Sequence, residues 1–485
     1  MKYFLATILA RIIRFTSVTF NLGGGTTLPG RVALRLCPNI LARLGKKFTE
    51  VILVTGVNGK TTTARMIAHG LKKVEPYDCQ GSTLDNSDER KIVQNRTGGN
   101  LLWGIVSCAL SAQKNSVAVL EVDEAAIFQV VKFLKPDLVL FHNLGRDQLD
   151  RYGEIDNIWK KWVETVKNLS KECKIILNAD DPFCASLGKF AKGKVFSYGV
   201  NDVSVMSSSR PAYADARLCL ECGHPLKYKK ILISHSGFFY CEKCKFKRLE
   251  PAVAAGKISV LENSSKMVVR AGKSGVVLSV PLVGLFNAVN ALAAATTLMA
   301  LGINLEKIAQ KISTFSAAFG RFEKIKVGNK NIEIMLIKNP AGATEVLKEI
   351  KRTSGQADKR TDGVEVKPRH KVFVVGINDN LADGTDVSWL WDTEFELLSR
   401  LNLDNRGQFF FTSGTRALDM ALRLKYAGIA EENIQVQESL EKAILEGLAK
   451  ISEGETLAVL LTYTAMLNVK TILAKKGFGK HYWKD

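Results

Sequence analysis

Residues 51–63 read VILVTGVNGKTTT, and this stretch decides the fold of the first part of the chain. An apolar, β-branched run enters a turn with Gly56 and Gly59, and a helical pattern follows over residues 61–73. Such a turn lets backbone N–H groups face phosphate oxygens, and the helix directs its positive end at the same anion. The stretch therefore predicts a nucleotide-phosphate loop, although Val54 replaces the first glycine of the common P-loop pattern.

The polar residues of this loop have predicted tasks. Lys60 supplies a charge at the outer phosphates of ATP and Thr61 a hydroxyl for Mg²⁺, while Asn58 and Thr62 complete the nucleotide-binding set. Glu121 closes a strand-like segment and is expected to reach the same Mg²⁺, with a simple helix cap as the alternative. A chance Gly-Lys-Thr turn is disfavoured by the strand before it and the helix after it. We expect Lys60 and Glu121 to be catalytic.

The chain is long enough, at 485 residues, for two or three domains. Strand-like runs at 51–56, 116–122, 137–143 and 174–180 alternate with helical stretches, which predicts an α/β domain with a mostly parallel sheet. A second α/β domain is expected from strand-like runs at 332–337, 371–376, 408–411 and 457–461, interrupted by an exposed polar loop at 352–370. The predicted parts are a basic helical segment (1–48), an ATP-binding central domain (49–314) and a C-terminal domain (315–485).

Two Cys-x-x-Cys pairs predict a metal site. Cys219 and Cys222 are separated by 18 residues from Cys241 and Cys244, the spacing of a zinc ribbon inserted at about 205–250. Four thiolates fill the coordination sphere, so the Zn²⁺ would be structural. A redox pair is the disfavoured alternative, and nucleic-acid binding by the lysine-rich ribbon stays open. The other cysteines (37, 79, 108, 173, 184) are expected to be core thiols in a reducing cytoplasm.

The charge of the chain is uneven. The formal net charge is +20, which suggests an anionic partner unless it only reflects a lysine-rich proteome. Residues 1–49 hold eight Lys or Arg and no acid. Within them an apolar pattern at helical spacing (Phe4, Leu5, Ile8, Leu9, Ile12, Ile13) is interrupted by Arg11 and Arg14, so it is too short and charged to span a membrane. This helix is expected to pack its apolar face on the next domain; the alternative is a membrane surface.

The motifs together resemble the Mur ligases, ATP-dependent enzymes of cell-wall synthesis. The matching stretches are TGVNGKTTT, EVDE (121–124), NLGRDQLDRYG (143–153), NADDP (178–182), the helix start with Asn287 and Asn290, and GRFE (320–323). The resemblance implies that Asn287 lies near the adenine and that Arg321 reaches the nucleotide phosphates. The chain departs from the pattern at Gln148, where a histidine is usual, and at KNPAG (338–342). An N-terminal UDP-sugar domain is missing, which fits a lipid-linked substrate.

The C-terminal part resembles the MurT family, the synthetase subunits of lipid II isoglutaminyl synthases. The stretches are NDNLADGTDVSWLWD (378–392), SGTRALDMALRLKYAG (413–428) and LTYTAML (461–467). The resemblance implies amidation of the α-carboxylate of D-glutamate in lipid II through an acyl phosphate, with ammonia from a separate glutaminase, GatD. It also implies that Asp386, or second Asp383, orients the catalytic histidine of that partner. A turn with core tryptophans is the plain alternative.

Two other functions remain open at this point. One is a self-sufficient ligase that adds an amino acid, like the folylpolyglutamate enzymes, and the C-terminal stretches argue against it. The other is a nucleic-acid-binding P-loop protein, which only the charge favours, so no nucleic-acid partner is expected. We expect the protein to be cytoplasmic, with contact at the inner face of the membrane where its substrate is anchored.

Overall fold

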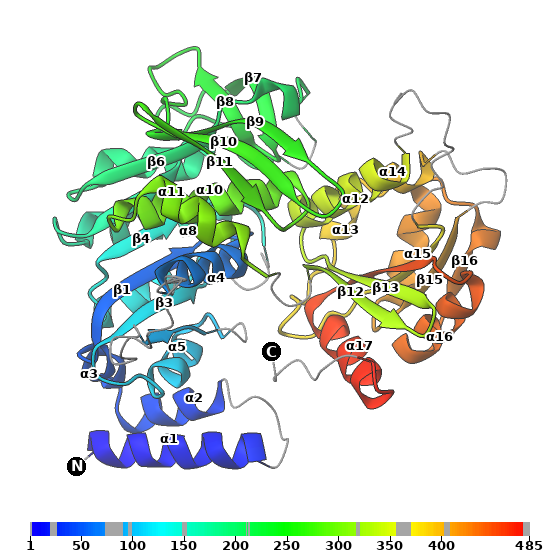
Figure 1. Cartoon of the computed structure of the whole chain (residues 1–485), viewed down its shortest axis with the longest axis horizontal. Coiled ribbons are helices and arrows are strands. Elements are labelled where there is room, and N and C mark those ends of the chain that lie inside the picture. The colour runs from blue at the N-terminus through cyan, green and yellow to red at the C-terminus, as the bar shows by residue number, and fades with distance from the viewer. Residues whose placement is uncertain are drawn as a thin grey trace, which may run out of the picture. The chain divides into compact units, whose positions relative to one another are not determined.

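The computed structural model describes residues 2–19, 27–72, 91–95, 99–147, 153–209, 211, 214–316, 321–355, 370–401 and 408–478. The chain forms two compact units (Figure 1). The first contains Met1–Gly145 and Glu154–Ser316, and the second contains Arg146–Gly153 and Ala317–Asp485.

The first unit is built on a nine-stranded sheet. Its order is β11 (Ser274–Val280), β10 (Ser265–Ala271), β9 (Val253–Val260), β6 (Val195–Val200), β5 (Lys174–Asn178), β4 (Leu138–Phe141), β1 (Phe48–Thr55), β3 (Ser116–Val122) and β2 (Ile92–Val93). The strands from β2 to β9 are parallel, and β9, β10 and β11 pair antiparallel. The mostly parallel α/β sheet predicted from the alternating pattern is confirmed.

Helices cover both faces of this sheet, which explains why its central strands are apolar throughout. On one face, α4 (Lys60–Leu71), α10 (Leu285–Ala300) and α11 (Leu305–Ser313) share a core with Ile52 and Leu140. On the other face, Trp162 of α8 (Ile155–Asn168) packs edge-on against Phe141 of β4. Alternate residues of one strand thus serve opposite cores. The unit also contains α5 (Leu102–Ala109), α6 (Ile127–Phe133), α9 (Pro182–Ser186), η2 (Leu187–Phe190) and η3 (Val203–Val205).

Three helices precede the sheet: α1 (Lys2–Thr19), α2 (Leu28–Leu36) and α3 (Ile40–Gly45). Helix α1 packs on α2, and its buried residues are Ala6 and Ala10. Phe4 and Phe15 are each 70% exposed. The expectation that this helix turns its apolar face to the next domain is therefore wrong for its largest side chains, because the alanines give the closer helix contact.

The predicted insert emerges between β6 and β9. It carries a separate two-stranded antiparallel sheet of β7 (Leu226–Ile233) and β8 (Ser236–Cys241). Gly237 N donates to Asp180 O, and Arg248 Nε donates to Asp180 Oδ1 at 2.6 Å, in a buried ion pair. The NADDP segment at the end of β5 therefore anchors the insert to the main sheet.

The second unit has a six-stranded sheet, mostly parallel. Its order is β12 (Arg321–Val327), β13 (Lys330–Leu336), β17 (Thr456–Leu461), β14 (Val372–Gly376), β15 (Phe409–Ser413) and β16 (Ile434–Val436), of which only β12 pairs antiparallel. Its helices are α12 (Pro340–Gly355), α13 (Trp389–Asp392), α14 (Glu396–Ser399), α15 (Ala417–Tyr426), η4 (Glu431–Asn433), α16 (Leu440–Lys450) and α17 (Tyr463–Lys475). Two cores fill the two faces of the sheet. This confirms the second α/β domain.

The polar loop expected at 352–370 is wrong for residues 352–355, which continue α12; residues 356–369 lie outside the described part of the chain. Among the described helices, none is both long and apolar enough to cross a membrane.

Candidate functional site

The predicted phosphate loop joins β1 to α4 in the first unit, at the carboxyl end of the parallel strands. Gly56 and Gly59 have φ values of 143° and 84°. A Cβ on Gly59 would lie 2.1 Å from Asn290 Oδ1, and one on Gly56 would lie 2.9 Å from Asn143 O. Both positions need glycine because the backbone conformation is unfavourable for other residues and the neighbouring chain is too close for a side chain.

Lys60 is buried at the start of α4 and is surrounded by acceptors. Its Nζ donates to Glu124 Oε2 at 2.8 Å, to Val57 O at 3.3 Å and to Gly56 O. Burial by itself lowers the pKa of Lys60, but the negative charges of Glu124, Asp123 and Glu121 outweigh it and raise the pKa above the usual lysine value. Lys60 is therefore a permanent cation at the position where an outer phosphate would need one.

Thr61 and Glu121 meet as the metal prediction requires. Thr61 Oγ1 donates to Glu121 Oε2 at 2.7 Å. Two neighbouring ligands of an octahedral Mg²⁺ lie about 3.0 Å apart, given metal–oxygen distances of about 2.1 Å. The pair therefore fits a shared Mg²⁺. Asn95 fixes the backbone of Glu121 through both its N–H and its carbonyl, at 2.9 and 2.7 Å.

Three more residues of the predicted nucleotide-binding set, Asn58, Thr62 and Asn287, lie around the same loop. Asn58 N donates to Asn143 Oδ1 at 2.8 Å, and Asn143 Nδ2 returns a bond to Asn58 O at 2.8 Å. Asn287, near the start of α10, is buried and accepts from Asn290 Nδ2 at 3.2 Å. Thr62 is buried on α4 next to Thr61.

Three residues of this site were not assigned a role from the sequence. The only sequence signal for Glu124 was its position at the end of the EVDE motif. The signal for Asn143 was a polar residue at the end of a predicted strand. His142 gave no signal: its Nε2 lies 2.7 Å from Asn290 Oδ1 and its Nδ1 lies 2.6 Å from Tyr198 OH, so it joins β4, α10 and β6 inside the core.

Arg321 cannot be related to this site. It begins β12, in the other unit, and its side chain lies outside the described part of the structure.

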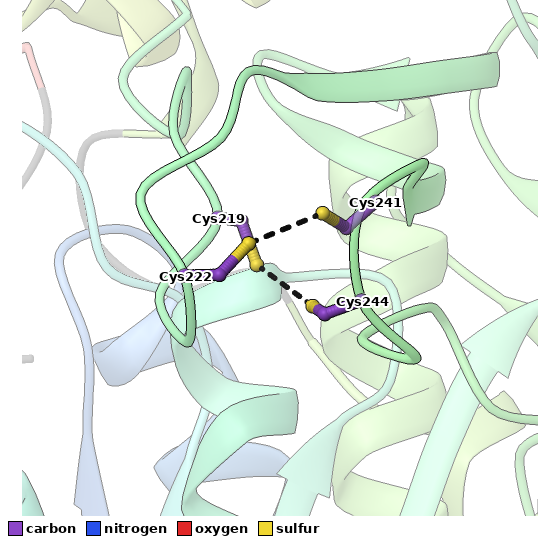
Figure 2. Close-up of side chains that lie close together, drawn as sticks. All are labelled: Cys219, Cys222, Cys241 and Cys244. Carbon is purple, nitrogen blue, oxygen red and sulfur yellow. Dashed lines mark hydrogen bonds between the residues drawn. The ribbon is translucent and has the colours of Figure 1, made fainter.

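The four predicted cysteines come together in the insert (Figure 2). Their sulfur atoms all lie within 4.8 Å of one another, with 3.5 Å between Cys219 and Cys244 and 3.5 Å between Cys222 and Cys241. Sulfur ligands of a tetrahedral Zn²⁺ lie about 3.8 Å apart, given Zn–S distances of about 2.3 Å. The cluster therefore fits a closed metal site.

Asp383 and Asp386 differ sharply in their surroundings, although both follow β14. Asp383 is buried and accepts from Thr464 N at 2.7 Å and from the Thr464 hydroxyl. Burial raises the pKa of Asp383, and the Thr464 donors partly offset this. Asp386 is exposed and accepts a local hydrogen bond from Ser388 N at 2.8 Å.

Known proteins resemble the chain over nearly all of its length. A family model described as "MurT ligase C-terminal" matches residues 336–466, and one described as "Mur ligase middle domain" matches residues 54–218. The MurT subunit of the lipid II isoglutaminyl synthase (glutamine-hydrolyzing) of Staphylococcus aureus strain COL is 33% identical, covering 95% of each chain. The corresponding subunit of Streptococcus pneumoniae is 30% identical, covering 98% of each chain.

A solved structure agrees in fold. The MurF ligase of Thermotoga maritima in complex with ADP has a TM-score of 0.59 and 15% sequence identity, covering 91% of this chain and 83% of that one. The relatives at 30% identity or more over nearly the whole length decide the classification: the chain belongs to the MurT family of the Mur ligases.

Proposed function

We propose that this protein is the synthetase subunit of a lipid II isoglutaminyl synthase. It would use ATP to convert the α-carboxylate of D-glutamate in the lipid II stem peptide into an acyl phosphate. Ammonia from a glutaminase partner of the GatD type would then displace phosphate and leave D-isoglutamine. The observation that carries the proposal is a buried lysine in the predicted phosphate loop, next to a threonine–glutamate pair, in a chain that is similar to a named MurT subunit over 95% of both chains.

The residues of the first unit suit the charge changes of phosphoryl transfer. ATP bound with Mg²⁺ supplies the phosphoryl group. Lys60 would hold its positive charge beside the transferring phosphoryl group. In this structure Glu124 balances the charge of Lys60. Thr61 and Glu121 would ligate Mg²⁺. Gly56, Asn58, Gly59 and Thr62 would shape the phosphate site, with Asn287 toward the base. The family resemblance implies that Arg321 would reach the nucleotide phosphates.

The four cysteines would hold a structural Zn²⁺ away from the chemistry. Cys219, Cys222, Cys241 and Cys244 leave no ligand position for substrate. We assign the ion to the stability of the insert rather than to catalysis.

The partner proposal is supported by exposed residues of the second unit. Asp386 is exposed and its neighbour Asp383 is already saturated by Thr464, so we assign to Asp386 the role of orienting the partner's catalytic histidine. On the same unit, α15 exposes Leu418, Leu422 and Tyr426, and the Tyr426 ring contacts exposed Trp391 of α13 at a centroid distance of 5.6 Å. An exposed apolar surface on the unit that also exposes this acid suits a protein partner better than solvent.

We place the enzyme in the cytoplasm at the inner face of the membrane, because ATP and the head group of the lipid-linked precursor meet there. Nucleic acid has no part in this proposal.

The test uses the full chain purified with its glutaminase partner and purified lipid II. Mass spectrometry should detect conversion of the carboxylate to the amide with glutamine, and also with ammonium salt when the partner is omitted. Lys60→Ala should abolish both reactions, whereas the exposed control Lys46→Ala should leave both intact. Full-speed amidation by Lys60→Ala would refute the proposal. Addition of an amino acid instead of nitrogen would establish the self-sufficient ligase.

A further inference from the structure

The N-terminal helix turns its large apolar side chains to solvent and its small ones to the protein. Helix α1 lies at an edge of the first unit, alongside α2 (Figure 1). Its buried positions are Ala6 and Ala10. Its exposed large apolar residues are Phe4, Leu5, Ile8, Ile12 and Phe15. A helix that served only to cover α2 would have the opposite arrangement, since apolar area stabilises when it is removed from water.

These exposed residues form one continuous stripe. Phe4, Ile8, Ile12 and Phe15 follow one another at steps of three or four residues, which bring side chains onto one helix face, and Leu5 lies next to Phe4. From Phe4 to Phe15 the stripe extends about 16 Å along the axis, at a rise of about 1.5 Å per residue. An apolar stripe of this length on the surface needs a partner.

The segment that carries the stripe contains only positive formal charges. Residues 1–49 contain eight Lys or Arg and no Asp or Glu. Arg11 and Arg14 of α1 and Arg35 of α2 are exposed. Arg43 of α3 is also exposed and lies over the Tyr3 ring, 5.4 Å from its centroid. The pKa of Lys47 is lowered first by burial and second by the positive charge of nearby Arg11. The partner of the stripe is therefore expected to be apolar at the centre and anionic at its border.

We propose that α1 docks the protein on the surface of a bilayer that contains anionic phospholipids. The stripe from Phe4 to Phe15 would lie among the outer acyl-chain segments, and Arg11 and Arg14 would contact lipid phosphates at its border. A second copy of the chain is a poor occupant, because a symmetric pairing through α1 would bring two acid-free, basic segments together. The glutaminase subunit is assigned above to a different surface, on the second unit.

This docking site goes beyond the proposed catalytic function, and its test measures vesicle binding rather than catalytic activity. Full-length protein is co-sedimented with vesicles of phosphatidylglycerol and phosphatidylcholine, and with vesicles of phosphatidylcholine alone. We expect clear binding to the anionic vesicles and weaker binding to the neutral ones. The double variant Phe4→Ser/Phe15→Ser should bind the anionic vesicles roughly tenfold more weakly or worse. The matched control Leu249→Ser/Val277→Ser removes two apolar residues exposed elsewhere on the first unit and should bind like the natural protein.

Two further variants distinguish insertion into lipid from purely electrostatic adsorption and from self-association. Arg11→Gln/Arg14→Gln should lose the preference for anionic vesicles while keeping the weak neutral binding. Phe4→Trp should show tryptophan emission that brominated phospholipids quench more than the emission of the natural protein, whose own six tryptophans set the background. No quenching beyond that background, or equal binding by Phe4→Ser/Phe15→Ser and the natural protein, would overturn the proposal. So would a natural dimer that Phe4→Ser/Phe15→Ser converts to monomer without any affinity for vesicles. Failure of the catalytic proposal would leave every one of these outcomes unchanged.

Discussion

The ion pair between Lys60 and Glu124 should be a large local contribution to the stability of the ligand-free protein. Both side chains are buried, with exposed fractions of 6% and 2%, and their charged atoms are 2.8 Å apart. Removing one member of such a pair usually costs about 3–5 kcal/mol because the other charge is left buried. Glu124→Gln keeps an acceptor for Lys60, and Asp123 and Glu121 remain nearby. We therefore expect a loss of about 2–3 kcal/mol.

The assay is thermal unfolding of the first unit followed by circular dichroism. A loss of that size should lower the Tm by about 3–5 °C for a unit of this length. Glu164→Gln on α8 makes the same charge change at an exposed position and should leave the Tm unshifted. A double-mutant cycle with Lys60→Met should return a coupling of about 2 kcal/mol between the two residues.

The reasoning can be refuted by how the Tm difference between Glu124→Gln and the natural protein depends on pH and on nucleotide. The pKa of Lys60 is raised on folding, so its contribution is complete below the unfolded pKa of 10.5 and is lost only as the pH rises through the higher folded value. The difference in Tm between Glu124→Gln and the natural protein should therefore be constant from neutral to mildly alkaline pH. Saturating Mg²⁺ and ATP should reduce this difference in Tm, because phosphate replaces the lost carboxylate beside Lys60. An unchanged Tm without ligand, or a gap that widens with nucleotide, would contradict this account.

Three other outcomes can be tested with the same protein. Cys219→Ser should reduce the bound zinc measured by metal analysis and make the ribbon sensitive to proteolysis, since it removes one of four thiolates; full zinc content would contradict the assignment. Asp386→Asn should leave thermal stability and ATP binding unchanged but abolish glutamine-dependent amidation. Asp383→Asn should instead lower the Tm, because Asp383 is buried against Thr464. Unchanged glutaminase activity of the complex with Asp386→Asn would reject the role of Asp386. Burial lowers the pKa of His235, but Asp181, 3.4 Å away, outweighs it and raises the pKa. The Tm advantage of the natural protein over His235→Gln should thus be full below about pH 6.5, and should disappear as the pH rises through the raised value; an advantage that grows toward alkaline pH would contradict this sign.

The strongest sequence predictions were those that depend on short-range pattern. The apolar run before Gly56 and the helix after Lys60 fix a strand–loop–helix, and the polar ends of parallel strands must meet at one edge of the sheet. This is why Thr61 and Glu121 were expected to be neighbours and lie 2.7 Å apart. The paired Cys-x-x-Cys turns likewise predicted a cluster that the fold brings together.

The sequence alone left the long-range choices undetermined. Helical spacing showed that Phe4 and Phe15 share a face, but it could not show that α2 would take the face of Ala6 and Ala10 instead. It placed Asp383 and Asp386 in one motif without separating the buried acid from the exposed one.

The sequence by itself thus determined the strand–loop–helix around Gly56 and Gly59, the pairing of the cysteines within each Cys-x-x-Cys turn, and the motifs that resemble the family, because each of these rests on spacing within a short segment. The tertiary structure decided which groups face each other across the sequence. Glu124 pairs with Lys60 from 64 positions away, and His142 reaches Asn290 from 148 positions away. Such pairings depend on the packing of whole strands and helices, which local periodicity does not encode.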